Sequence, residues 1–173
     1  MVHSHTLFTL LQVLAVAVAT YYFAALIQTT LHVFLGHDRR GGIFFRAHLG
    51  NHHALYSRVF TTKNYVDEDE SLTVYYLLPT ALFSALAFWL LPLAFAVTVL
   101  GGFLFSFTAH VYVHVQYHLE DSSLDRLPWF RRRKHLHKLH HEQPNRNFGV
   151  LEFVWDRFLG TYTEHSIAER RYE

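Results

Sequence analysis

The chain has 173 residues, of which 51% are hydrophobic and 15 are histidine, and its formal net charge is +1. This length suits one domain, and the near-neutral charge gives no electrostatic basis for binding nucleic acid. Because cysteine is absent, disulfides, cysteine-held iron–sulfur clusters and cysteine-based zinc fingers are excluded.

Two long stretches contain no charged residue. No Asp, Glu, Lys or Arg precedes Asp38, and none occurs from Ser71 to Leu119. The second stretch has room for two membrane crossings of about 20 residues each, with Pro92 at the turn between them. A signal peptide in the first stretch and buried helices of a soluble bundle in the second are the alternatives. The first lacks an initial Lys or Arg, and the second lacks a polar stripe.

We therefore predict an all-α integral membrane bundle, a single domain over residues 1–173. It has about three transmembrane helices, at residues 7–31, 72–91 and 93–117. All 15 Lys and Arg residues lie in segments 39–63 and 126–171. Two crossings separate these segments, so they lie on the same side of the membrane, and the positive-inside rule places that side in the cytoplasm.

The predicted spans are longer than a bilayer requires. A helix from Leu93 to His118 measures roughly 39 Å, against a hydrocarbon core of ~30 Å. Its last turns should project on the cytoplasmic side, and the first helix can also continue past Leu31. The projecting ends carry histidines, so we expect a histidine-rich helical cap at this face.

The histidines form four clusters, all on one side of the membrane in this topology. They are His32 and His37; His48, His52 and His53; His110, His114 and His118; and His135, His137, His140 and His141.

The spacing of these histidines indicates metal binding. Residues four apart share a helix face, so His114 and His118 can serve one site. HLGNHH and HLHKLHH each offer a pair three or four residues apart, and a neighbouring histidine turned by about 100° can reach a second ion. A mononuclear site rarely takes more than four imidazoles, so ten converging histidines imply two metals. Imidazole alone leaves Zn, Cu, Ni and Fe open.

This pattern resembles the fatty acid hydroxylase superfamily of membrane-bound, histidine-rich di-iron enzymes, which includes sterol desaturases. The resemblance runs from His32 to about Tyr162, and its most specific part is H-x2-HH followed by NRNFG and WDRFLGTY. It implies two metal ions, iron in the native enzyme with zinc as an alternative in a purified form, and O₂ as co-substrate. The metal ligands it implies are His32, His37, His48, His52, His53, His114, His118, His137, His140 and His141.

Residues beside these ligands have open roles. The ligand pair of the third cluster could be His110 and His114 instead of His114 and His118. Otherwise His110 could support a ligand from behind or contact the substrate. The role of His135 is also open. Metal-bound imidazoles usually donate their second N–H to a carboxylate or carbonyl, so Asp156 or Asn147 is expected to orient a ligand ring. The alternative is a turn with Gly149 at a special backbone angle, a helix cap at Asp156 and an interfacial anchor at Trp155.

The resemblance implies O₂-dependent hydroxylation or desaturation of an unactivated C–H bond in a lipid such as a fatty acyl chain or sterol. The reaction needs two electrons, and without a nucleotide-binding motif in the chain we expect a separate ferredoxin- or cytochrome-type donor. RRRK at residues 131–134 could dock an acidic donor, or bind anionic lipid headgroups.

Two other functions remain open. A carotenoid ring hydroxylase has similar histidine boxes, although the WDRFLGTY tail argues against it. A non-catalytic metal-binding membrane protein, such as a transporter, should place its ligands near the bilayer midplane. The sequence leaves the substrate, the carbon attacked and the oligomeric state undetermined.

Overall fold

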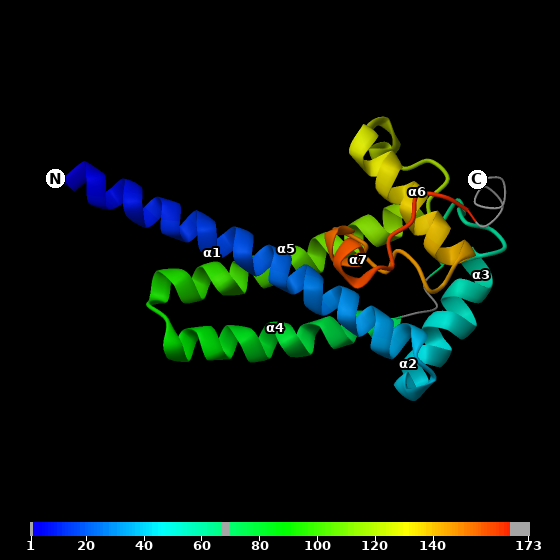
Figure 1. Ribbon diagram of the computed structural model, residues 1–173, viewed down its shortest axis with the longest axis horizontal. Helices are drawn as coiled ribbons and strands as arrows, with labels where there is room; N and C mark the ends of the chain where they lie inside the picture. The colour runs from blue at the N-terminus through cyan, green and yellow to red at the C-terminus, as the bar shows by residue number, and fades with distance from the viewer. Residues whose placement is uncertain (1, 67–69, 167–173) are drawn as a thin grey trace.

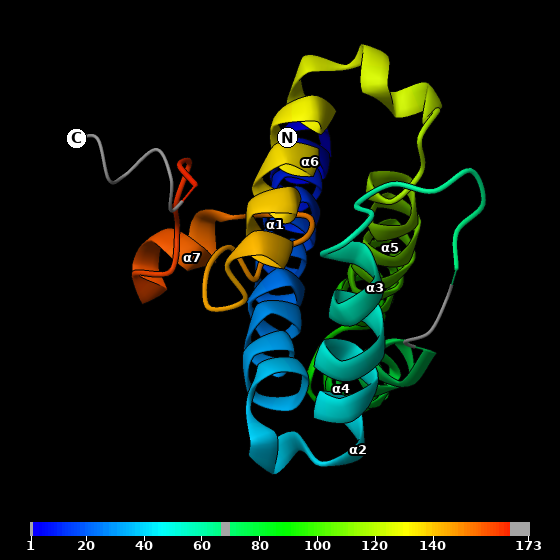
Figure 2. The ribbon, with the colours of Figure 1, turned by 90° about the vertical axis from the view of Figure 1, so that its right-hand side faces the viewer.

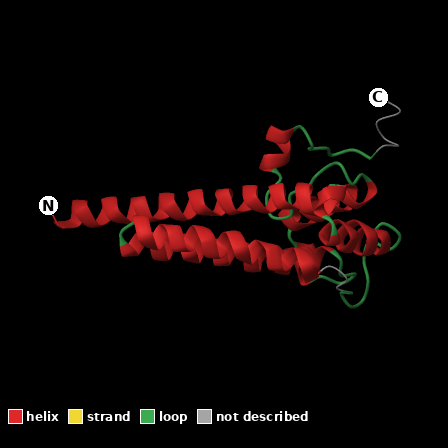
Figure 3. Ribbon diagram, turned by 90° about the horizontal axis from the view of Figure 1, so that it is seen from below, coloured by secondary structure: helices red, strands yellow, loops and turns green. Residues whose placement is uncertain are grey.

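The computed structural model describes residues 2–66 and 70–166. Within these residues the chain is helical, with one isolated bridge between Thr62 and Leu119 and no strand. Figure 3 shows long helices at one end and short helices with loops at the other. The predicted all-α class is confirmed over this part of the chain.

Three long helices form a stem (Figure 1). They are α1 (Val2–Leu31), α4 (Glu70–Leu90) and α5 (Leu93–Tyr117), and α5 packs against both of the others. The backbone groups of a charge-free run must be satisfied internally away from water, which favours helices. Pro92 caps the start of α5, so the turn between α4 and α5 lies where the sequence predicted it.

Two helices are long and apolar enough to cross a membrane, Thr6–His37 and Leu93–Tyr117. The apolar part of α4 that the structure describes, Tyr75–Leu90, is shorter. Large apolar side chains are exposed along the outer stem, including Leu14, Leu82 and Leu104. Such an extensive apolar surface is typical of a membrane-facing region.

The rest of the chain forms a cap over one end of the stem (Figure 2). Its elements in chain order are η1 (His32–His37), η2 (Arg39–Gly41), α2 (Ile43–Phe45), η3 (Arg46–His53), α3 (Ala54–Tyr56), η4 (Ser123–Arg126), α6 (Pro128–Glu142) and α7 (Val154–Leu159). A small apolar core joins cap to stem, and it includes Tyr117 of α5, Phe130 of α6, and Val150 and Leu151 of the following loop.

The helix that begins with α1 continues through η1 into the cap. At 1.5 Å per residue, Thr6–His37 is about 48 Å long, well beyond a hydrocarbon core of ~30 Å. The large apolar side chains from Leu7 to Phe23 are mostly exposed, whereas Ala24, Ala25 and His32 are buried. One face of the last turns of this helix is therefore buried against the cap, and these turns bring His32 and His37 there.

Candidate metal centre

The cap gathers nine of the ten predicted ligands into two groups. Within each group, one nitrogen of every ring lies within 4.8 Å of the corresponding nitrogens of the others. The first group is His32, His37, His48, His53 and His140, and the second group is His52, His118, His137 and His141.

Each pair of adjacent histidines is divided between the two groups. His52 belongs to the second group and His53 to the first, while His140 belongs to the first and His141 to the second. Successive side chains on a helix point about 100° apart, so one helix between two sites can serve both. The sequence-based expectation that the neighbouring ring reaches a second site therefore agrees with this geometry.

The pairing within HLGNHH differs from the expectation. A spacing of four predicted that His48 and His52 share a site, but His48 lies in the first group with His53, five residues away. In the π-helix η3, whose hydrogen bonds span five residues instead of four, residues five apart lie closer to one face than in an α-helix, which makes the His48–His53 pairing possible. His32 and His37, also five apart in a π-helix, share the first group in the same way.

A glycine makes room for the first group. A Cβ atom at Gly36 would lie 2.9 Å from Cδ2 of His48 and 3.1 Å from Cδ2 of His32. Both distances are shorter than ordinary packing contacts allow. Gly36 is therefore required by the close approach of two imidazoles to the η1 backbone, a role that its position inside H-x4-H did not disclose.

The remaining histidines of these clusters lie outside the two groups. The His114 ring centroid is 4.9 Å from that of His52 and 4.8 Å from that of His137, so His114 lies beside the second group. His110 is one turn deeper and packs its ring against Tyr76 at 4.7 Å. His135 is exposed on α6, with Nε2 3.4 Å from the Glu164 carbonyl.

Three of the rings are oriented by backbone carbonyls. Nδ1 lies 2.6 Å from the Phe148 carbonyl in His32, 2.9 Å from the Phe60 carbonyl in His118, and 2.6 Å from the Arg146 carbonyl in His140. A carbonyl only accepts, so each Nδ1 carries the proton and each Nε2 presents a lone pair to the group. This is the arrangement that metal-binding histidines commonly have.

Several of the ring nitrogens are spaced as they would be around an ion, and one pair, Nε2 of His32 and of His48, is closer at 2.7 Å. Nε2 of His53 is 3.1 Å from Nε2 of His140, and Nε2 of His137 is 3.1 Å from that of His118 and 3.2 Å from that of His141. Two imidazole nitrogens about 2.1 Å from one ion stand about 3.0–3.4 Å apart at ordinary bond angles. The residues present therefore fit two metal ions, one in each group.

The protonation of the rings also suits metal binding. Burial lowers the pKa of His48, His53, His137 and His141 well below its usual value, and it lowers the pKa of His118 to about 3. Neutral imidazole is the form that binds a metal. Both nitrogens of the fully buried His52 lack a hydrogen-bond partner within the described residues, a cost that a metal bond would remove.

The tail after the last histidines holds the loop that orients the first group. Asp156, which is 0% exposed, accepts hydrogen bonds from the backbone N–H groups of Phe148 and Gly149 at 2.7 and 2.8 Å and from the Thr161 hydroxyl at 2.6 Å. Its hydrogen bonds thus reach the loop rather than an imidazole. By holding the backbone at Phe148, these hydrogen bonds keep the Phe148 carbonyl in place as the hydrogen-bond partner of His32.

Asn147 acts on the same loop. Its side chain donates to the carbonyls of Leu136 and Thr163 and accepts from the Thr163 N–H, so it ties the loop to α6 and to the end of the tail. The alternative interpretation, a turn with Gly149 at a special backbone angle, is wrong about the residue that has this angle. The positive φ, 52°, is at Asn147, whereas Gly149 is needed for space, because a Cβ there would lie 2.3 Å from the Glu152 carbonyl oxygen.

The helix-cap interpretation of Asp156 is also wrong. Phe153 is the N-cap of α7, and Asp156 lies inside the first turn of that helix. Trp155 donates its indole N–H to the Tyr22 carbonyl at 3.0 Å, which fastens α7 to the side of α1.

Sequence reasoning missed Tyr56. This side chain is fully buried, and its ring stacks on His118 with centroids 3.8 Å apart and an interplanar angle of 27°. Its hydroxyl donates to the Val66 carbonyl and accepts from the Val66 N–H. Tyr56 therefore supports the second group as the 146–148 loop supports the first. The sequence did contain a sign of this role, because Tyr56 is four residues after His52 and residues four apart share a helix face.

Comparison with known proteins agrees with this geometry. The family model described as "Fatty acid hydroxylase" matches residues 13–161. Searches of curated proteins and of solved structures found no match. The matched region contains every histidine of both groups, and the two apolar helices together with the family indicate a membrane protein. The chain therefore belongs to the fatty acid hydroxylase family.

Proposed function

We propose that the protein is a di-iron oxygenase that hydroxylates or desaturates an unactivated C–H bond of a lipid, using O₂ and two external electrons. The family supports a membrane hydroxylase or desaturase in general terms. The observation that carries the finer proposal is the division of nine buried or half-buried histidines into two adjoining groups at one end of the apolar stem.

The chain's own residues have defined parts in this scheme. The two iron ions, when bound by the two groups, would supply the activation of O₂ for attack on the C–H bond. The carbonyls of Phe148, Phe60 and Arg146 keep three rings in the metal-binding tautomer. Burial of the rings, which leaves His52, His137 and His140 with 0% exposure, keeps water away from the oxidant.

The stem offers a path for an apolar substrate. A cavity of about 340 Å³ lies among α1, α4 and α5 and is lined mainly by apolar side chains, among them Phe23, Phe83 and Phe103. Phe103 also lines a smaller, deeper cavity of about 10 Å³, room for roughly one water, with Gln28 and Tyr76. Because Tyr76 packs on His110, a substrate chain in the larger cavity would have to widen this small one to approach the histidines of α5.

His110 is suited to position the substrate. It is 6% exposed, and its Nδ1 has no hydrogen-bond partner within the described residues. On one side its ring contacts Tyr76, which lines the deeper cavity. On the other side it faces His114, whose ring centroid is 6.2 Å away. We assign His110 a contact with the substrate near the reacting carbon, so His110→Ala should retain both metals but change the position or yield of oxidation.

The topology and the electron donor are further parts of the proposal. We place three spans in the membrane, with α4 as the third, and both histidine groups at the cytoplasmic face. An acidic ferredoxin- or cytochrome-type protein would deliver the electrons there. Within RRRK, Arg132, Arg133 and Lys134 form ion pairs with Glu164, Glu152 and Asp125. Arg131 has no carboxylate partner among the described residues, so it is the part of this stretch best placed to meet such a donor.

The proposal is tested by metal content and lipid products together. We expect the purified protein to hold about two iron ions per chain. Cells that express it should accumulate a hydroxylated or desaturated lipid only when O₂ is supplied. His141→Gln should abolish the product, whereas His135→Gln, on the exposed side of the same helix, should not. Bound metal with an unchanged lipid profile under these conditions would contradict an oxygenase and favour a metal-binding role.

A further inference from the structure

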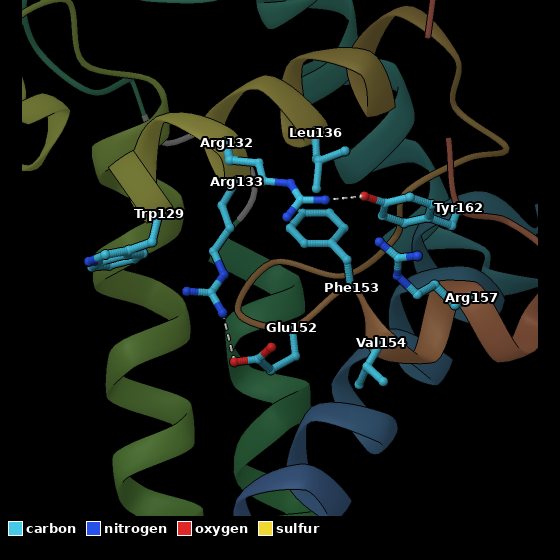
Figure 4. A pocket seen from close by; sticks show the side chains of 9 residues that line it. All are labelled: Trp129, Arg132, Arg133, Leu136, Glu152, Phe153, Val154, Arg157 and Tyr162. Carbon is cyan, nitrogen blue, oxygen red and sulfur yellow. Dashed lines mark hydrogen bonds and ion pairs between the residues drawn. The ribbon is translucent and has the colours of Figure 1, made fainter. Parts of the chain in front are cut away.

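A second site lies beside the first half of α6, toward its N-terminus from the histidines of that helix. A cavity of about 320 Å³ is bounded by α6, the loop before α7 and α7 itself (Figure 4). Three guanidinium groups and one carboxylate line it, those of Arg132, Arg133, Arg157 and Glu152. The lining charges are therefore predominantly positive, and the aromatic rings of Trp129 and Tyr162 complete the walls.

The guanidinium groups differ in how they are neutralised. Arg133 donates to Glu152 at 2.8 Å, and Arg132 pairs with Glu164 at the rim. Arg157 instead stacks over the Tyr162 ring at 3.9 Å and has no salt-bridge partner among the described residues. Figure 4 shows the Arg157 guanidinium beside Tyr162 at one wall of the cavity. One cation thus remains to receive an anion, with Arg133 on the facing wall.

The pocket adjoins the lipid-facing surface of the stem. Oε1 of Glu152 accepts hydrogen bonds from both Arg133 and the Tyr21 hydroxyl of α1, each at 2.8 Å. Tyr21 also lines an apolar groove of about 560 Å³ between α1 and α5, together with Val18, Gly101 and Phe105. The hydrogen bond between Tyr21 and Glu152 therefore joins the wall of the basic pocket to the wall of an apolar groove on helices long enough to cross a membrane.

The residues beside the pocket are of the kinds found at a bilayer surface. The Trp155 indole bonds to the Tyr22 carbonyl of α1, and Phe158 and Leu159 on the same short helix are 79% and 53% exposed. Trp side chains and exposed apolar residues next to arginine are typical of the region where lipid headgroups meet hydrocarbon. Arg157 is part of this helix, so we expect its guanidinium at headgroup depth.

We propose that this pocket binds the phosphate of an anionic phospholipid whose acyl chain occupies the groove between α1 and α5. Arg157 and Arg133 contact the phosphate, and the groove beside Tyr21 receives the first part of the chain. The site is distinct from the histidine groups and needs no metal. It would hold the cap at a fixed depth on the membrane.

The test separates the headgroup from the chain. Arg157→Gln removes the unpaired cation. Gly101→Leu fills the groove, because a Cβ at Gly101 meets no atom within 4 Å. Arg131→Gln, an exposed arginine on α6 outside the pocket, and Ala94→Leu, an exposed position on α5 outside the groove, are the matched controls. The full chain in detergent is incubated with phosphatidic acid, with phosphatidylcholine of the same chain lengths, or with inorganic phosphate, and adducts are counted by native mass spectrometry.

We expect the unaltered protein to retain phosphatidic acid in preference to phosphatidylcholine. Retention should fall about tenfold in Arg157→Gln, as the loss of one charge-assisted hydrogen bond predicts. It should also fall in Gly101→Leu but not in either control. Equal retention in Arg157→Gln and Arg131→Gln would overturn the proposal.

Two other outcomes would also overturn it. If inorganic phosphate competed for the site and Gly101→Leu retained as much phosphatidic acid as the unaltered protein, the pocket would bind a soluble anion. If Arg157→Gln left lipid retention intact but slowed turnover with an acidic electron donor, the pocket would be a protein-docking surface.

Discussion

The two histidine groups are similar in composition but are held by different kinds of structure. The first group depends on a loop, because His32 and His140 both bond to carbonyls within residues 146–148. The second group depends on helices and an adjacent bridge. His118 is the C-cap of α5, stacks on Tyr56 and donates to the Phe60 carbonyl, close to the bridge between Thr62 and Leu119. The two histidine groups should therefore respond differently to changes in distant residues.

The largest expected effect comes from the adjacent residues His140 and His141. His140→Gln should lose the metal of the first group and His141→Gln that of the second, because each removes a ligand that glutamine does not replace. Metal analysis should give about one ion per chain in either variant and two in His135→Gln. Loss of both ions from both variants would show that the groups bind as one cooperative unit.

A smaller effect is expected from the support of the loop. Asp156→Asn replaces a carboxylate that accepts three hydrogen bonds, and it should weaken metal binding in the first group by about 10- to 100-fold. Burial raises the pKa of the Asp156 carboxyl, and its donors oppose that rise. Competition with a chelator measures the two affinities.

The matched control for that variant is Asp125→Asn, which breaks a partly exposed pair with Lys134 away from the loop. An equal loss of affinity at both groups in Asp156→Asn would contradict the separate support of the two groups.

A third effect concerns the space around the first group. Gly36→Ala inserts a methyl group against His48 and His32, and such overpacking typically costs about 1–3 kcal/mol. Thermal unfolding should show this loss together with weaker metal binding in the first group. Gly50→Ala is the control, because a Cβ at Gly50 meets no atom within 4 Å. Equal stability of the two variants would mean that η1 can move away from the rings.

The smallest effect is expected from the support of the second group. Tyr56→Phe keeps the ring on His118 and removes only the hydroxyl bonds to Val66. We expect a loss of about 1 kcal/mol of unfolding free energy, with both metals retained. If metal binding in the second group fell as far as that of the first group in Asp156→Asn, the two supports would be equivalent.

The sequence predicted the stem better than the cap, for a physical reason. Hydropathy and the absence of charge depend on local residues alone, so the start and end of α5 agree with the predicted residues 93–117. On α6, ordinary helical spacing correctly pairs His137 with His141. The π-helical winding of η3, where His48 and His53 share the first group, could not be expected from the spacing, because HLGNHH suits an ordinary helical turn and π-helices are rare.

The role of the tail was equally inaccessible. That Asp156 reaches the backbone at Phe148, and thereby His32, is a consequence of how the loop folds back. The spacing of the residues alone left a direct bond to an imidazole and a helix cap as the two expectations.

The central claim, that these groups bind two ions, is tested most directly by locating iron in the native protein. Anomalous diffraction at the iron edge should give two peaks, one among the nitrogens of His32, His37, His48, His53 and His140 and one among those of His52, His118, His137 and His141. A single peak, or peaks away from both groups, would contradict the account.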